Sequence, residues 1–174
     1  MTIRKILTEP DPFLRQKSEK VQEVNDDIRL LMDDMLDTMY DAPGIGLAAI
    51  QIGVPKRVIV IDLSKNEEKK DPQYFVNPEI ITKSKKDASY EEGCLSVPNQ
   101  FAEISRPDTC RVKFLNYNGE ETILDAKGLL ATCVQHEMDH LEGILFIDYL
   151  SKLKKSMIIK KLSKQKKTLE RIVV

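Results

Sequence analysis

The two histidines of this 174-residue chain both lie in one pentapeptide, His136-Glu137-Met138-Asp139-His140. If this segment is helical, residues four apart lie on one face, about 6 Å apart along the axis. Two imidazoles in that arrangement can bind one metal ion, and the glutamate between them can face a water on that ion. A charged surface turn that matches by chance is the alternative, but the scarcity of histidine argues against it. The pattern therefore predicts a metal-binding helix around which the rest of the chain must fold.

The residues on either side of the pentapeptide favour a helix. The segment from Gly128 to Gly143 contains no proline, and apolar residues recur in it at helical spacing. These apolar residues are Leu129, Leu130, Cys133, Val134 and Leu141. Gly143 is the predicted stop of the helix. Asp139 could support a histidine or face solvent, and we expect it to face solvent.

A catalytic metal site usually has three protein ligands and one open position for water, so one ligand is missing. Metzincin proteases carry a further histidine six residues after the second, but this chain has Phe146 at that position. Other zinc proteases use a glutamate from a later helix as the third ligand. This chain offers few candidates for that role, because Glu170 is the only acid after Asp148. These observations argue against a zinc protease and make the cysteines the candidates for the third ligand.

Three cysteines are available. Cys110 alternates with charged neighbours, as a residue on the core face of a strand does, so we expect an inert buried thiol. Cys133 lies one turn before the first histidine and is expected to line the pocket rather than bind the metal. Cys94 lies in a short bend between Gly93 and Pro98, which can present its side chain and neighbouring N–H groups toward a site. A buried structural cysteine is the alternative there, but Cys94 is the best candidate for the third ligand.

A second segment, residues 43–53, contains Gly44-Ile45-Gly46 and a run of small residues before Gln51. Glycines at these positions allow a ligand to approach the backbone closely. The spacing lacks the full dinucleotide-binding or phosphate-loop signature, so it is a weak signal by itself. Gln51 could donate to an oxyanion, although a surface amide is the commoner case.

Three short motifs follow one another along the chain, at Gly44–Gln51, Glu92–Ser96 and His136–His140. They read Gly-x-Gly-x-Ala-Ala-x-Gln, Glu-Gly-Cys-x-Ser and His-Glu-x-x-His, and in this order they resemble the motifs of peptide deformylase. No motif residue departs from the family pattern, and the resemblance extends from Pro10 to about Lys155. It implies an enzyme that removes the formyl group from N-formylmethionine at the N-terminus of newly made polypeptides and releases formate.

The resemblance implies a role for each matching residue. The metal ligands would be Cys94, His136 and His140. The catalytic residues would be Glu137 as general acid/base, with Gln51 and the backbone N–H of Leu95 stabilising the oxyanion. The substrate would be held by Ile45, Gly46, Gly93, Leu129 and Cys133. In the implied reaction a metal-bound hydroxide attacks the formyl carbon, while the glutamate carries a proton to the leaving amine.

The resemblance also implies one divalent metal ion, which in this family is usually Fe2+. A site of two imidazoles and one thiolate also accepts Zn2+, Ni2+ or Co2+, so ligand spacing does not identify the metal. A ferrous–thiolate site would be sensitive to oxygen.

The chain fits a single α+β domain, with mainly antiparallel strands packed around a central metal-binding helix and with N-terminal and C-terminal helices. Residues 1–150 would form the catalytic domain that resembles peptide deformylase. Residues 151–174 would form a basic C-terminal helix of the same domain. An amphipathic helix is predicted over residues 26–40, with Asn25 as its N-cap.

Strand signals fill the middle of the chain. A buried strand is predicted over residues 57–61 and a short one over residues 74–76. Residues 109–117 and 121–124 are expected to pair across an Asn-Gly turn. The charged residues 64–71 are expected to form a surface loop.

Charge is unevenly distributed, although the net charge is only −1. Residues 151–174 carry nine Lys or Arg side chains against one acid. An amphipathic helix that packs on its own domain is one interpretation. Docking on the ribosome through rRNA phosphates, near emerging nascent chains, is the other, and the resemblance supports it. The apolar stripe of this helix would consist of Leu150, Leu153, Met157, Ile158, Leu162 and Leu169.

The sequence contains no apolar run long enough to span a membrane and no signal-peptide core. Three widely spaced cysteines provide no disulfide framework, which favours the reducing cytoplasm. We expect a monomer that binds neither DNA nor membranes. Two other functions compete with a deformylase. A zinc endopeptidase lacks its third histidine, and a non-catalytic RNA- or ribosome-binding module with a structural metal lacks a fourth ligand.

Overall fold

A computed structural model of the chain describes residues 2–64 and 69–172, with side chains described as far as residue 168. The helices are α1 (Asp26–Asp41), α2 (Gly128–Leu141) and α3 (Lys152–Ile172), and the 3-10 turns are η1 (Pro12–Arg15), η2 (Ala49–Ile52) and η4 (Phe146–Tyr149). The strands are β1 (Gly46–Ala48), β2 (Val58–Ile61), β3 (Gln73–Lys83), β4 (Asp87–Cys94), β5 (Val97–Pro107), β6 (Thr109–Leu115) and β7 (Glu121–Lys127).

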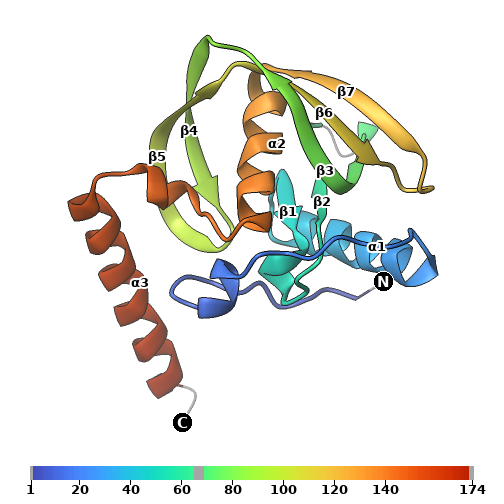
Figure 1. Cartoon of the computed structure of the whole chain (residues 1–174). Helices are drawn as coiled ribbons and strands as arrows, with labels where there is room; N and C mark the ends of the chain where they lie inside the picture. Colours follow the sequence, from blue (N-terminus) through green and yellow to red (C-terminus); the bar gives the residue numbers. More distant parts are fainter. Residues whose placement is uncertain (1, 65–68, 173–174) are drawn as a thin grey trace.

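Two antiparallel sheets enclose helix α2. The five-stranded sheet has the order β1-β2-β3-β6-β7, and β4 pairs with β5 in a separate two-stranded sheet. Helix α2 contacts strands of both sheets, and Figure 1 shows it standing between them. Helix α1 packs against β1 and β2. The α+β class predicted from the sequence is confirmed.

Helix α1 forms where the apolar spacing predicts it. The side chain of Asn25 accepts a hydrogen bond from the backbone N–H of Ile28 at 3.1 Å, which satisfies one of the free donors of the first turn. The apolar stripe is buried against β1 and β2, and its fully buried members are Met32, Met35 and Met39. Both the N-cap and the amphipathic helix are therefore confirmed.

Helix α2 is buried on most of its surface, as its central position requires. It ends at Leu141, and Gly143 follows with a φ of 74°, a left-handed conformation that favours glycine. A Cβ atom at Gly143 would also collide with the carbonyl oxygen of Arg15, so the N-terminal part of the chain passes directly over this turn. The predicted helix and its predicted stop are confirmed.

The strands predicted in the middle of the chain are present, and the hairpin of β6 and β7 pairs Leu115 with Glu121 across the expected Asn-Gly turn. The sheet is built from more residues than expected, because β3 continues to Lys83. Ser64 and Asp71 are exposed, in agreement with a surface loop, while residues 65–68 of that loop lie outside the described part of the chain.

Residues 87–107 fold differently from the expectation. Only a short bend was predicted there, whereas β4 and β5 form a long two-stranded sheet that turns just after Cys94. Four side chains of these strands are buried, those of Glu92, Val97, Ile104 and Arg106. Because two of the four are charged, hydrophobic periodicity does not reveal the strands.

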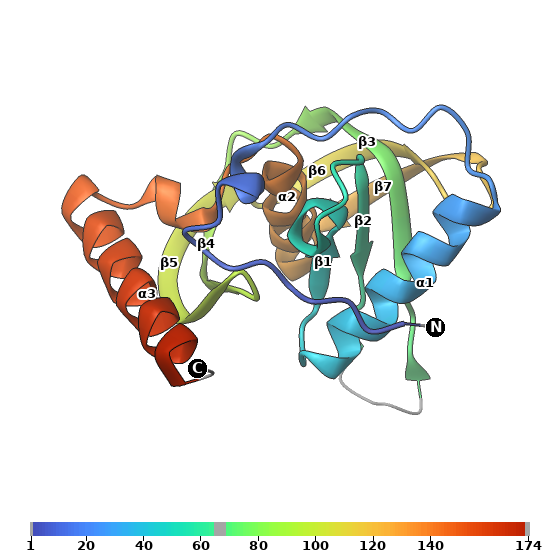
Figure 2. The same ribbon diagram turned by 90° about the horizontal axis from the view of Figure 1, so that it is seen from below.

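The C-terminal segment forms the predicted helix, α3, which projects from the body of the molecule (Figures 1 and 2). The side chain of Leu162 is buried against Phe146 and its neighbours, whereas Leu153 is 72% exposed and Met157 is 62% exposed. The predicted apolar stripe is therefore only partly covered, and the side chain of Leu169 lies outside the described residues. No helix in the described part of the chain combines the length and apolarity needed to cross a membrane.

Candidate active site and metal centre

The three residues predicted to bind metal lie together in the structure. One ligand atom from each of Cys94, His136 and His140 lies within 4.8 Å of the others, and Cys94 Sγ is 3.3 Å from His140 Nε2. A thiolate and an imidazole on one tetrahedral ion would be roughly 3.6 Å apart, given typical metal–ligand lengths. The donor set and its spacing therefore fit a divalent ion. Two of the candidate ligands come from one face of α2 and the third from the end of β4.

Glu137 faces the same site and is 5% exposed. Burial raises the pKa of this carboxyl to about 7 in the metal-free protein. Its Oε2 atom is buried and makes no hydrogen bond with any described residue, so a polar guest such as water would satisfy it. A Cβ atom at Gly46 would collide with the other oxygen of Glu137, which is why β1 begins with glycine.

Gln51 is buried beside the predicted ligands, and the common alternative, a surface amide, is wrong. Its Oε1 accepts a hydrogen bond from the backbone N–H of Ala48 at 2.8 Å, which sets the orientation of the amide. Its Nε2 group donates to Ser96 Oγ at 3.0 Å and lies 3.5 Å from Cys94 Sγ. The amide donor therefore points toward the candidate metal centre, where Leu95 also lines the cavity.

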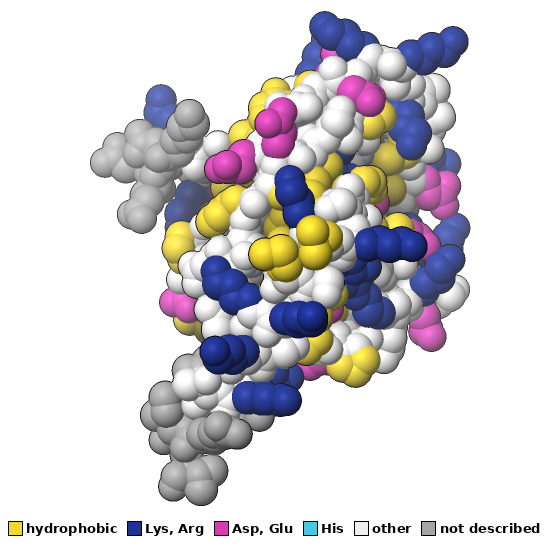
Figure 3. All heavy atoms as spheres, turned by 90° about the vertical axis from the view of Figure 1, so that its left-hand side faces the viewer, with side chains coloured by type: hydrophobic (Ala, Val, Ile, Leu, Met, Phe, Trp, Pro, Cys, Tyr) yellow, Lys and Arg dark blue, Asp and Glu magenta, His cyan; other side chains and the backbone are white. Residues whose placement is uncertain are grey.

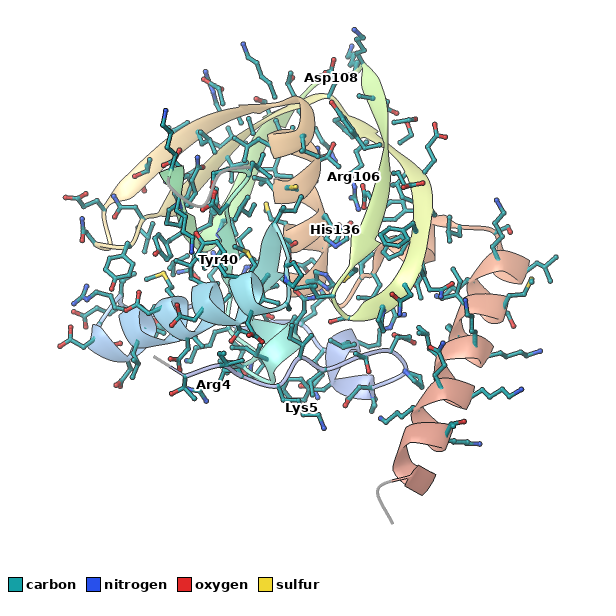
Figure 4. The ribbon with its side chains drawn as sticks, turned by 180° about the vertical axis from the view of Figure 1, so that it is seen from behind. Arg4, Lys5, Tyr40, Arg106, Asp108 and His136 are labelled. Carbon is teal, nitrogen blue, oxygen red and sulfur yellow. The ribbon has the colours of Figure 1, made fainter. Side chains whose placement is uncertain are left out.

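A buried ion network supports the first histidine, and the sequence analysis did not include it. Glu92 Oε2 lies 2.8 Å from His136 Nδ1, which leaves Nε2 of that imidazole free for a metal. Arg106 donates to both oxygens of Glu92, at 2.6 and 3.0 Å. Figure 4 shows Arg106 and His136 close together between the two-stranded sheet and α2. Although burial raises it, these hydrogen bonds hold the pKa of Glu92 below its usual value.

The expectation for Asp139 was wrong. Its carboxylate accepts hydrogen bonds from Arg106 Nη1 and from the hydroxyl of Tyr149, both at 2.8 Å, instead of facing solvent. Asp139 therefore helps to position the Arg106 guanidinium. Arg106 in turn positions Glu92, which contacts His136. Its place immediately before His140 was the only signal in the sequence, and it does not distinguish an ion pair from a solvated side chain.

A cavity of about 410 Å³ opens beside Glu137 and His136. All five residues predicted to contact substrate line it, namely Ile45, Gly46, Gly93, Leu129 and Cys133. Burial raises the pKa of the Cys133 thiol to about 12, so this cysteine stays protonated and apolar at neutral pH. The sequence analysis missed Phe101, which is 66% exposed at the cavity and packs so closely over Gly93 that a Cβ there would collide.

Comparison with known proteins places this site in a family. A family model described as Polypeptide deformylase matches residues 3–156. The chain belongs to the peptide deformylase family. A peptide deformylase from Pelagibacter ubique is 68% identical over 174 residues and covers all of both chains. One from Phenylobacterium zucineum is 60% identical over 167 residues, which are 96% of this chain and 99% of the relative.

Solved peptide deformylases share the fold. The crystal structure of the enzyme from Ehrlichia chaffeensis superposes with a TM-score of 0.91 at 42% identity, covering 96% of this chain and 98% of that one. Its complex with actinonin gives a TM-score of 0.89 at 44% identity and covers 95% and 98% of the two chains. The resemblance inferred from the motifs is confirmed. The chain is therefore an enzyme that removes N-formyl groups from nascent peptides, which decides against the endopeptidase and the non-catalytic module.

Proposed function

We propose that the chain is a metal-dependent deformylase in which Cys94, His136 and His140 hold one divalent ion. The observation that carries the proposal is the clustering of these ligand atoms next to the Gln51 amide and to Glu137 Oε2, an atom that no described residue hydrogen-bonds, beside one cavity. Such an ion, when bound, would supply Lewis acidity toward the formyl oxygen and lower the pKa of a water molecule.

Residues of the chain carry out the proton transfers and stabilise the negative charge that develops on the substrate. Glu137 takes a proton from the attacking water and delivers it to the leaving amine, a role that suits a buried carboxyl beside the candidate metal ligands. The Gln51 Nε2 group and the backbone N–H of Leu95 donate to the formyl oxygen as negative charge develops on it. Formate and a peptide with a free N-terminus are the products.

The cavity selects the substrate. Its interior next to Cys133 accepts the methionine side chain of an N-formylmethionyl peptide, because the thiol there is neutral and apolar. Gly46 is the first residue of β1 and directly follows Ile45, and Gly93 lies near the end of β4. Both strands are outer strands of their sheets, where an extended peptide can pair with backbone groups. Actinonin, the molecule bound in the Ehrlichia chaffeensis complex, is expected to compete with the peptide here.

We infer that Fe2+ is the resident ion, with Zn2+, Ni2+ or Co2+ able to replace it. The support for Fe2+ is membership of a family in which this ion is usual, while one thiolate and two imidazoles accept all four ions. The enzyme would act in the cytoplasm, where nascent chains are made, and the predicted monomeric state stays a prediction.

Replacing Glu137 with Gln tests the mechanism. Anaerobically prepared protein should release formate from a formylmethionyl tripeptide, and Glu137→Gln should lower kcat by about 10²–10⁴-fold with metal content unchanged. Glu103→Gln, at an exposed position of β5, is the matched control and should keep the full rate. Metal analysis of the same samples identifies the ion. Full activity of Glu137→Gln with metal bound would contradict the assigned role.

We also propose that α3 is the ribosome-docking element. It projects from the body, and Figure 3 shows Lys and Arg side chains gathered along it beside exposed hydrophobic ones. Basic side chains on a protruding helix can bind rRNA phosphates, and this would place the cavity near nascent chains.

A further inference from the structure

We propose that residues 2–9, here called the N-terminal strap, position the oxyanion-binding groups of the active site. The positioning residues are Leu7 and Glu9, which act through their backbone N–H groups and do not touch substrate. The inference rests on the role proposed above for Gln51.

Two hydrogen bonds join the strap to the site. The N–H of Leu7 donates to the carbonyl oxygen of Gln51 at 2.7 Å. The N–H of Glu9 donates to the carbonyl oxygen of Ser96 at 2.8 Å. These two acceptors belong to the residues whose side chains already meet, since Gln51 Nε2 donates to Ser96 Oγ at 3.0 Å. The strap, Gln51 and Ser96 are therefore joined in a closed loop of hydrogen bonds, which includes the Gln51 amide that faces the candidate metal centre.

The spacing of the two donors limits movement of the acceptors. Leu7 and Glu9 are two residues apart, and two residues of chain span at most about 7 Å. The turn η2, which carries Gln51, follows β1 of the five-stranded sheet. The bend after Cys94 joins β4 to β5 in the two-stranded sheet, so the two segments are distant in sequence. A short segment bonded to both holds them at one separation. It thereby holds the Gln51 donor relative to the N–H of Leu95, the residue before Ser96.

Both ends of the strap are anchored away from the cavity. At the outer end, the Thr2 N–H donates to Asp34 Oδ1 at 2.7 Å, and the Arg4 guanidinium donates to the same carboxylate at 2.7 and 3.0 Å. At the inner end, Arg15 pairs with Glu9 at 3.2 Å. Figure 2 shows the blue segment running from beside α1, past β1, toward β4, and Figure 4 labels Arg4 at its outer end.

Removing one donor without changing a side chain tests the proposal. An amide-to-ester replacement at Leu7, made by incorporating the corresponding α-hydroxy acid, removes the N–H that donates to Gln51 and leaves every side chain in place. In the metal-loaded full-length enzyme, kcat for a formylmethionyl tripeptide should fall about tenfold. This is less than the cost of about 10²–10³ for deleting an oxyanion donor outright. The KM should stay within about twofold, because the donor acts in the transition state.

Two matched esters control for chemistry and stability. The Thr8 ester makes the same chemical change in the same segment, but the Thr8 N–H donates no hydrogen bond within the described residues. The Glu19 ester removes a bond of 2.8 Å to Pro55, outside the cavity, and reports the cost of losing any such bond. Both control proteins should keep kcat within about twofold of the wild type, while the Leu7 and Glu19 esters lower the melting temperature similarly.

A double-mutant cycle separates positioning from general destabilisation. In the Gln51→Ala background the Leu7 ester should have no further effect on kcat, since the group that it positions is gone. An equal tenfold loss in both backgrounds, or no loss in the wild type, would overturn the strap proposal alone. A Gln51→Ala enzyme with wild-type kcat would overturn the proposed role of Gln51, and the strap proposal with it.

Discussion

Among single residues, Arg106 shows how a buried charge is kept in place. Its side chain is 5% exposed and lies between two carboxylates, those of Glu92 and Asp139. Glu92 in turn contacts His136, so the guanidinium neutralises the acid that orients a candidate ligand. A buried charge left without its partner is costly, which makes this residue a sensitive point of the fold.

Arg106→Met should therefore be strongly destabilising. The variant leaves the carboxylates of Glu92 and Asp139 without their shared cation. We expect the free energy of unfolding at pH 7 to fall by about 3–5 kcal/mol. Urea unfolding followed by circular dichroism measures it.

Arg111→Met is the matched control for that change. Arg111 also makes a two-pronged contact, with Asp125 at 2.7 and 2.9 Å, but its side chain is 51% exposed. Its replacement should change stability much less, because water screens the pair. Equal losses in the two variants would show that the Arg106 network contributes no more than a surface ion pair.

Among the elements, α1 does more than cover the sheet, because it anchors the start of the chain. The Asp34 side chain on its inner face is 2% exposed and receives hydrogen bonds from Thr2 and Arg4. Burial alone would raise the pKa of Asp34, but the hydrogen bonds from Arg4 and Thr2 outweigh it and hold the pKa below its usual value. The charged form is thus favoured in the folded state.

This lowered pKa predicts a pH-dependent contribution to stability. A carboxyl whose pKa is lower in the folded state stabilises the fold above its unfolded pKa, about 3.9, and loses this contribution as pH falls toward the folded value. Asp34→Asn should therefore be less stable than the wild type at pH 7, and the gap should narrow from about pH 5 downward.

Thermal unfolding from pH 7 to pH 3 measures that gap. Asp41→Asn, at an exposed position of the same helix, is the control and should shift the melting temperature much less. A gap for Asp34→Asn that stayed constant over the whole range would contradict the assignment.

For the whole molecule, the question is what the projecting α3 does. It is joined to the body through the buried Leu162 and through Lys155, which pairs with Asp148 of η4. The exposed lysines beyond these contacts are not needed for packing. They are available for a polyanion. Residues 151–174 carry nine Lys or Arg side chains against one acid while the whole chain has a net charge of −1, so positive charge is concentrated in this segment.

Reversing three of these charges should abolish docking. A variant with Lys160, Lys161 and Lys164 changed to Glu should lose co-sedimentation with ribosomes and keep its kcat on a free formyl tripeptide. Wild-type binding should weaken steeply between about 50 and 200 mM salt, as expected when cations neutralise phosphates. Changing Lys85 and Lys86 to Glu, in the exposed turn between β3 and β4, is the control. Unchanged, salt-insensitive binding by the triple variant would contradict the proposal.

The sequence by itself determined the elements whose signals are local. The spacing of His136 and His140 is a property of one helix, and the cap at Asn25 and the Asn-Gly turn are each encoded within a few residues. Cys94 became the candidate for the third ligand because the alternatives were few, and the structure places it beside the two histidines. The three motifs sufficed to name the family, since they carry the residues that its chemistry needs.

Only the tertiary structure decided which distant groups support that chemistry. Arg106 meets Glu92 across two strands that hydrophobic periodicity does not reveal, because half of their buried side chains are charged. The strap acts through the backbone N–H groups of Leu7 and Glu9. Every residue except proline has such a donor, so this role cannot be recognised from the residue type. Long-range pairing depends on how the whole chain folds, whereas a motif depends on its own few residues.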